Sequence, residues 1–175
     1  MTTTQAPFPT PAELSVMPCQ AFTEALEGIF EHSAWVTQRA WHARPFDSVQ
    51  ALHKALLDAV SQADPADQLA LIRAHPELAG KEAAQGTLTQ ASTQEQQGAG
   101  LDQCSADELA RLRRLNAAYR ERFGFPFIIA VKGLSRHQIM DAIDTRLLNS
   151  RDIELSTCLQ EIGKIARFRL DARYS

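Results

Sequence analysis

The stretch that decides the fold is residues 48–76, SVQALHKALLDAVSQADPADQLALIRAHP. Apolar residues follow Ser48 at the spacing of an α-helix, at Leu52, Ala55, Leu56, Ala59 and Val60. This helix should stop near Ala63, and Asp64-Pro65 is a typical start signal for the next one, which leads into His75. Two successive helical patterns of this kind predict an all-α fold.

The same signals recur on both sides of this stretch. Thr10 before Pro11 is a candidate N-cap, and capping boxes begin at Ser105 and Ser135. Apolar stripes from Phe22 to His32 and from Trp35 to Ala40 predict two more helices, and a last helix should run from about Asp152 to Arg169. The sequence therefore predicts a single-domain, multi-helix bundle over residues 10–175, after a flexible, proline-punctuated N-terminal arm of residues 1–9.

Composition excludes several classes of protein. The 175 residues are 45% hydrophobic and 22% charged, with a formal net charge of -3, which suits one globular domain and gives no reason to expect a nucleic-acid or membrane partner. Cys19, Cys104 and Cys158 form no C-x-x-C pair, so neither a disulfide framework nor a zinc site is predicted. With no signal-peptide pattern at the N-terminus, the chain is expected in the reducing cytoplasm.

The dipeptide His75-Pro76 should end a helix, because the proline ring disfavours helical geometry at the residue before it. A histidine at such a break can point its imidazole into a cavity, where it can transfer protons near neutral pH. The alternative interpretation is a helix-ending histidine that interacts with the helix C-terminus. The remaining histidines are scattered singly, so no metal site is predicted.

Two further segments each allow a structural and a functional interpretation. Ser92 followed by Glu95 fits a capping box, or a first-turn carboxylate that binds a small polar ligand together with Gln96. Residues 125–131 are apolar and β-branched, as in a buried strand, yet the sequence offers no strand to pair with them. They are either a helix start after Pro126 or an extended run whose backbone groups bind a ligand.

Four segments in fixed order resemble the OHCU decarboxylase family, the ureidoimidazoline decarboxylases of uric acid degradation. They are residues 75–80, 92–96, 123–128 and 161–170, and the resemblance extends from about Thr10 to Leu170. It implies an all-helical, usually dimeric enzyme. The expected reaction converts 2-oxo-4-hydroxy-4-carboxy-5-ureidoimidazoline (OHCU) to (S)-allantoin and CO2 without a cofactor.

The resemblance also assigns roles by position. His75 matches the family's proton donor, Glu95 a second essential polar residue, and Arg169 an arginine expected to anchor an anionic or carbonyl oxygen. The expected substrate-binding positions are Pro76, Ser92, Thr93, Gln94, Glu95, Gln96, Phe127, Ile128, Ile129, Ala130 and Val131.

Two rival functions use the same residues. A binding module with this fold could hold a ureide ligand without converting it, although the presence of His75, Glu95 and Arg169 favours catalysis. A cofactor-free hydrolase could use His75 to activate water, and it would give a ring-opened product and no CO2.

Overall fold

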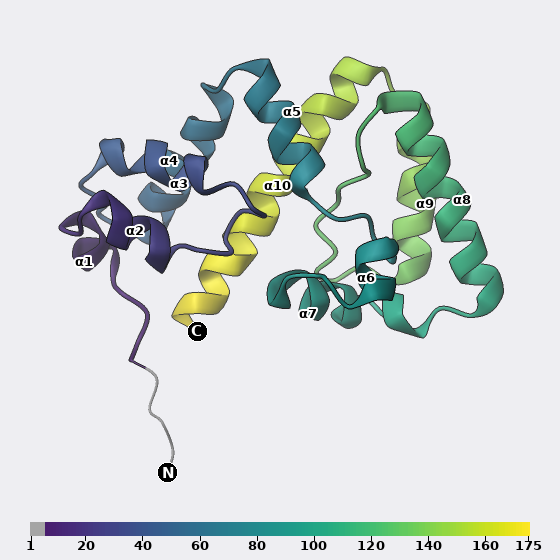
Figure 1. Ribbon diagram of the computed structural model, residues 1–175, viewed down its shortest axis with the longest axis horizontal. Coiled ribbons are helices and arrows are strands. Elements are labelled where there is room, and N and C mark those ends of the chain that lie inside the picture. Colours follow the sequence, from purple (N-terminus) through teal and green to yellow (C-terminus); the bar gives the residue numbers. More distant parts are fainter. Residues whose placement is uncertain (1–5) are drawn as a thin grey trace, which may run out of the picture. The chain divides into compact units, whose positions relative to one another are not determined.

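The computed structural model describes residues 6–175, and the first five residues of the expected arm lie outside them. Within the described residues the chain forms α-helices and short 3-10 helices, with no strand, so the all-α prediction is confirmed (Figure 1). The elements are α1 (Pro11–Ser15), α2 (Cys19–Ala25), α3 (Ala34–Ala40), η1 (Trp41–Ala43), α4 (Val49–Ser61), α5 (Pro65–Ala74), α6 (Lys81–Gln85), α7 (Gln90–Gly98), η2 (Leu101–Gln103), α8 (Ala106–Phe123), α9 (Arg136–Arg146) and α10 (Arg151–Tyr174).

Backbone contacts divide the chain into two compact units. The first comprises the described residues up to Ala63 together with Ala166–Ser175, and the second is Asp64–Ile165. Helix α10 contributes residues to both units. The single domain expected from residue 10 onward stays a prediction. No helix in the described part of the chain is both long and apolar enough to cross a bilayer.

The first unit begins as predicted and then departs from the prediction. Thr10 caps α1 in a capping box with Glu13, and Ser48 caps α4. The helix expected up to His32 is shorter, because α2 ends at Ala25. The apolar residues beyond that end, Leu26, Ile29 and Phe30, are buried all the same, so the stripe marks core residues in turns as well as in a helix.

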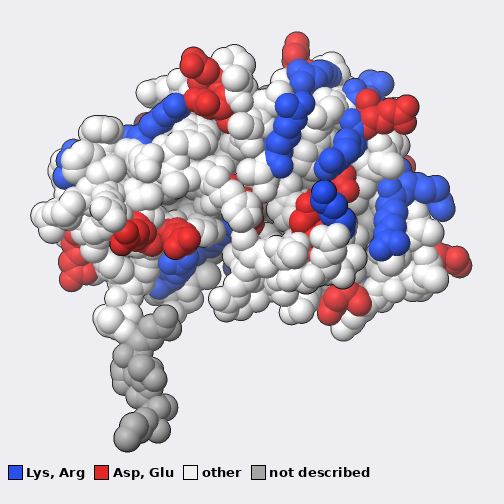
Figure 2. Space-filling view, viewed as in Figure 1, with Lys and Arg blue, Asp and Glu red and all other residues white. Residues whose placement is uncertain are grey.

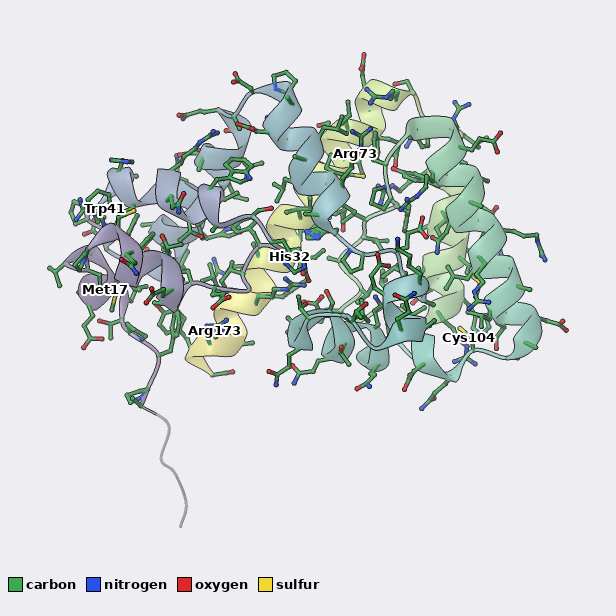
Figure 3. All side chains as sticks on the ribbon, viewed as in Figure 1. Met17, His32, Trp41, Arg73, Cys104 and Arg173 are labelled. Carbon is green, nitrogen blue, oxygen red and sulfur yellow. The ribbon has the colours of Figure 1, made fainter. Side chains whose placement is uncertain are left out.

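Contacts between distant segments complete the first unit. Helices α3 and α4 pack on each other, and the Trp41 indole nitrogen donates a hydrogen bond to the Met17 carbonyl at 2.9 Å (Figure 3). Part of the expected flexible arm is also held: the Tyr174 hydroxyl donates to the Pro9 carbonyl at 2.8 Å, and the Tyr174 ring meets Phe8 edge-on.

The second unit is built on α5, α8, α9 and the first part of α10. Helix α5 starts at Pro65 and ends at Ala74, and the predicted capping boxes of Ser105 and Ser135 open α8 and α9. Helices α8 and α9 pack against each other. Basic and acidic side chains lie side by side on the visible face of this unit (Figure 2). One ion pair joins the two helices, with Arg111 of α8 contacting Asp144 of α9 at 2.8 Å.

Residues 125–131 of the second unit are extended and irregular, so they form neither the helix nor the paired strand that their pattern allowed. Six of these seven residues are buried, and Ile129 is half-buried. A buried extended segment needs hydrogen-bond partners for its backbone. In this chain, side chains from α9 and α10 supply them, as described below.

Candidate active site

His75 lies directly after the last residue of α5. Its backbone is extended, with φ -74° and ψ 134°, which is the break that Pro76 was expected to impose. The residue is only 7% exposed. The imidazole therefore lies inside the second unit, whereas a histidine that merely ends a helix would be expected near the surface.

The loop after His75 is fixed by contacts from two helices. The Ala79 amide donates to Gln96 Oε1 of α7 at 2.9 Å, and Asn116 Nδ2 of α8 donates to the Leu78 carbonyl at 2.9 Å. Ala79 has a φ of 49°, a strained value for a residue with a Cβ. At the end of the loop, a Cβ on Gly80 would lie 2.8 Å from the Cβ of Glu77, so glycine is required there.

Helix α7 corrects the capping-box interpretation of Ser92 and Glu95. Its N-cap is Thr89, whose hydroxyl accepts a hydrogen bond from the Ser92 amide. Glu95 therefore lies in the second turn, and the first-turn position expected for it is wrong.

The side chains of α7 point in different directions. Ser92 and Gln96 are buried on one face and Glu95 is half-buried beside them, whereas Gln94 is exposed. The Thr93 hydroxyl donates to the Thr89 carbonyl, within the helix. The buried face of α7 is thus the face that contacts the loop after His75, through Gln96.

The extended segment is held by polar side chains. The Ile128 carbonyl accepts from Arg146 Nη1 at 2.6 Å, and the Ala130 amide donates to Glu161 Oε2 at 2.8 Å. Some backbone groups that were expected to bind a ligand are therefore already used within the protein.

One face of α8 connects the loop after His75 with the extended segment. Asn116 donates from its Nδ2 to the Leu78 carbonyl, and Tyr119 lies one turn further along the same face. The Tyr119 ring packs edge-on against Phe127, with 5.2 Å between the ring centroids. Since Gln96 joins α7 to the same loop, contacts within the second unit link three of the four segments that carry the resemblance, residues 75–80, 92–96 and 123–128.

Arg169, the third expected catalytic residue, belongs to the first unit. Its Nη1 donates to the Gly28 carbonyl at 2.9 Å, and its Nη2 donates to Glu31 Oε1 at 3.0 Å. Both side chains of this ion pair are buried. Glu31 therefore fixes the plane of the guanidinium.

Glu31→Gln should lower the free energy of unfolding by about 2 kcal/mol, because the buried guanidinium loses its countercharge while glutamine keeps an acceptor in place. Urea unfolding measures the change. The control is Asp58→Asn, which removes the exposed Lys54–Asp58 pair of the same unit and should cost no more than about 0.5 kcal/mol. Equal changes in the two variants would contradict the prediction.

Sequence reasoning missed the side chains that support the site. Asn116 occupies a buried position of α8 between Leu112 and Tyr119, and Arg146 follows the buried Ile143 by three residues in α9. A polar residue within an apolar stripe was the available signal in both cases. Across residues 6–175, no group of three or more His, Cys, Asp or Glu side chains is arranged to hold a metal ion.

Comparison with known proteins identifies the class of this fold and site. The family model for OHCU decarboxylase matches residues 15–171, which places the chain among the helical carboxy-lyases. The chain is similar to the 2-oxo-4-hydroxy-4-carboxy-5-ureidoimidazoline decarboxylase of Haloferax volcanii, with 43% identity over 89% of this chain and 90% of that protein. The chain belongs to the OHCU decarboxylase family.

Some of the matched proteins are longer than this chain. The uric acid degradation bifunctional protein PucL of Bacillus subtilis is 42% identical over 90% of this chain, which spans 31% of that protein. Among solved structures, an (S)-allantoin synthase aligns with a TM-score of 0.75 and 27% identity over 94% of this chain and 54% of that one. An OHCU decarboxylase crystallised in the presence of (S)-allantoin aligns with a TM-score of 0.67, at 24% identity, over 82% of this chain and 92% of that one, and supports the fold.

Proposed function

We propose that this chain converts OHCU to (S)-allantoin and CO2 in uric acid degradation, with His75 as the acid–base residue. The observation that carries the proposal is the buried His75 in a loop that α7 and α8 hold, within a chain that belongs to the OHCU decarboxylase family. A buried imidazole at a fixed position suits proton transfer to one face of a small molecule.

The substrate supplies its own electron sink. The bond between the ring carbon and the carboxylate breaks, and its electron pair moves toward the adjacent C=N group. The ring nitrogen of that C=N group takes up a proton, and the enol-like intermediate then gains a proton on the carbon that bears the ureido group and loses the proton of its hydroxyl, which becomes the ring carbonyl. The protein has to orient the carboxylate, stabilise the enol-like intermediate and deliver the proton from one side, and none of these tasks calls for a cofactor.

The polar face of α7 suits the recognition of the ureide. Glu95 can accept hydrogen bonds from the ring or ureido N–H groups, and it can orient the imidazole of His75. Gln96 uses its Oε1 on Ala79, so its Nε2 is the group it would present to a substrate oxygen. Ser92 is buried on this face. Pro76 and residues 127–131 would complete the walls of the site.

Arg169 is proposed to bind an anionic or carbonyl oxygen of the substrate. A guanidinium carries N–H donors in a fixed planar fork, and that of Arg169 bonds to the Gly28 carbonyl and to Glu31. The ion pair with Glu31 would thus set the direction of this fork.

The reaction is tested by following the circular dichroism of allantoin. Uricase and hydroxyisourate hydrolase generate OHCU in place, and this protein is then added. Rapid growth of the (S)-allantoin signal together with CO2 release is expected. Slow racemic product, as in the spontaneous reaction, would favour the binding module instead. A ring-opened product without CO2 would favour the hydrolase.

We also propose that the chain is a homodimer, because the family resemblance implies one. Light scattering should then give twice the chain mass of 19.4 kDa, and a monomer would refute the proposal. A reducing cytoplasm is the proposed compartment, since Cys19, Cys104 and Cys158 are free thiols.

A further inference from the structure

We propose that Arg146 and Glu154 are positioning residues, which hold the backbone of residues 127–131 in the shape that binds the substrate. The inference rests on the proposed function, because it takes this extended segment as a wall of the substrate site. Neither side chain is among the residues expected to touch the substrate.

Arg146, the last residue of α9, contacts the segment in two ways. Its Nη1 donates to the Ile128 carbonyl at 2.6 Å, and its guanidinium lies over the Phe127 ring with 4.3 Å to the centroid. Its Nε donates to Glu154 Oε1 at 2.8 Å. Because a guanidinium is planar, the bond to Glu154 also fixes the direction of the bond to Ile128.

Glu154, in the first turn of α10, is fully buried and has three donors around it. Besides Arg146, the Tyr119 hydroxyl donates to Oε1 at 2.5 Å and Asn149 Nδ2 donates to Oε2 at 2.9 Å. Both carboxylate oxygens are therefore fixed. The ion pair is anchored in α8, in the α9–α10 connection and in α10 itself.

The charges of the cluster balance within this pair. Burial raises the pKa of the Cys158 thiol, which lies 3.5 Å from Arg146 Nη2, and burial also raises the pKa of Tyr119. The ion-pair partner of Arg146 is Glu154, with 2.8 Å between Arg146 Nε and Glu154 Oε1. A buried ion pair contributes little net stability compared with apolar residues of similar size. We therefore assign the ion pair a geometric role, which is to hold the extended segment in position.

The orientation of the backbone N–H and C=O groups explains how the Arg146–Glu154 pair could affect ligand binding. In an extended chain, the N–H and C=O of one residue point to one side and those of the next residue to the other. The Ile128 carbonyl accepts a hydrogen bond from Arg146, and the Ala130 amide donates one to Glu161. By this alternation, the polar groups of Ile129 would lie on the opposite side of the chain, where the proposal places the ligand.

Two conservative variants test the proposal. Arg146→Lys keeps the charge but loses the planar fork, and Glu154→Gln keeps the shape but loses the charge. In both, kcat/KM for OHCU should fall about 100-fold, mainly through a higher KM, because a displaced backbone weakens binding before it affects proton transfer. Amide hydrogen exchange at residues 128–131 should become faster in the same variants.

Arg111→Met is the matched control. It removes an arginine of α8 that pairs with Asp141 and Asp144 of α9, the helix that ends at Arg146. It should leave KM and the exchange of residues 128–131 unchanged. A lower melting temperature in Arg146→Lys and Glu154→Gln with unchanged KM and exchange would make the pair merely structural and overturn the proposal. If one variant does not fold, the other decides between these outcomes.

An assay of the unsubstituted parent protein distinguishes a failure of this inference from a failure of the proposed function. A parent that does not accelerate (S)-allantoin formation would refute the decarboxylase. The exchange comparison would still report whether the ion pair holds the segment. A fully active parent with variants of unchanged KM would refute the positioning role alone.

Discussion

His75→Ala should reduce the rate of (S)-allantoin formation by about 100-fold to 10,000-fold, which is the usual contribution of a general acid or base. The helical circular-dichroism spectrum should be retained, because side chains of α7 and α8, Gln96 and Asn116, hold the loop after His75. The coupled circular-dichroism assay measures the rate.

The side chain of His75 is buried, so its removal also leaves a small cavity, with a cost in stability of about 1 to 3 kcal/mol. His75→Gln fills most of that volume without restoring an imidazole, and its rate should be as low as that of the alanine variant. His42→Ala is the control, since His42 is an exposed histidine of the first unit. A His75→Gln rate within threefold of the parent would show that no proton passes through this residue.

Glu95→Gln should reduce kcat/KM by about 100-fold, since the charged acceptor that we propose binds the substrate N–H groups is replaced by an amide that can also donate. Glu95 is half-buried in the second turn of α7, next to the Gln96 that binds the loop after His75. The size of the side chain is unchanged, so the melting temperature should stay close to that of the parent.

Gln97→Ala provides the control for Glu95, because Gln97 is an exposed residue two positions along the same helix. Its kinetics should match the parent. If Glu95→Gln also retains full kcat/KM, Glu95 is a surface carboxylate of α7 and the proposed recognition of the ureide moves to Ser92 and Gln96.

Helix starts were the most reliable predictions, because the side chains that cap a helix lie within three residues of its first turn. Thr10, Ser105 and Ser135 are N-caps with side-chain bonds, as predicted, and Ser48 caps α4 in the same way. The error at Ser92 has the same local origin. Thr89 and Ser92 both carry hydroxyls at suitable spacing, and Thr89 is the one that caps α7.

The sequence alone determined the all-α class, the break at His75 and, through the family resemblance, the candidate site residues. These features depend on neighbouring residues or on motifs with fixed spacing. Only the tertiary structure decided the conformation of residues 125–131, because periodicity is the same for a buried strand and a buried helix start. The partners that keep it extended, Arg146 and Glu161, lie 18 and 31 residues away from the groups they bind.

Tertiary contacts likewise decided that the His75 side chain is buried and that Arg169 is paired with Glu31. The donor and acceptor of the Arg169–Glu31 bond are 138 residues apart, and no local pattern links them. A buried charge needs a countercharge or hydrogen-bond partners, yet the sequence does not say which residue supplies them. Local chemistry therefore determined where the helices and motifs begin and end, and long-range packing decided which polar groups meet inside the protein.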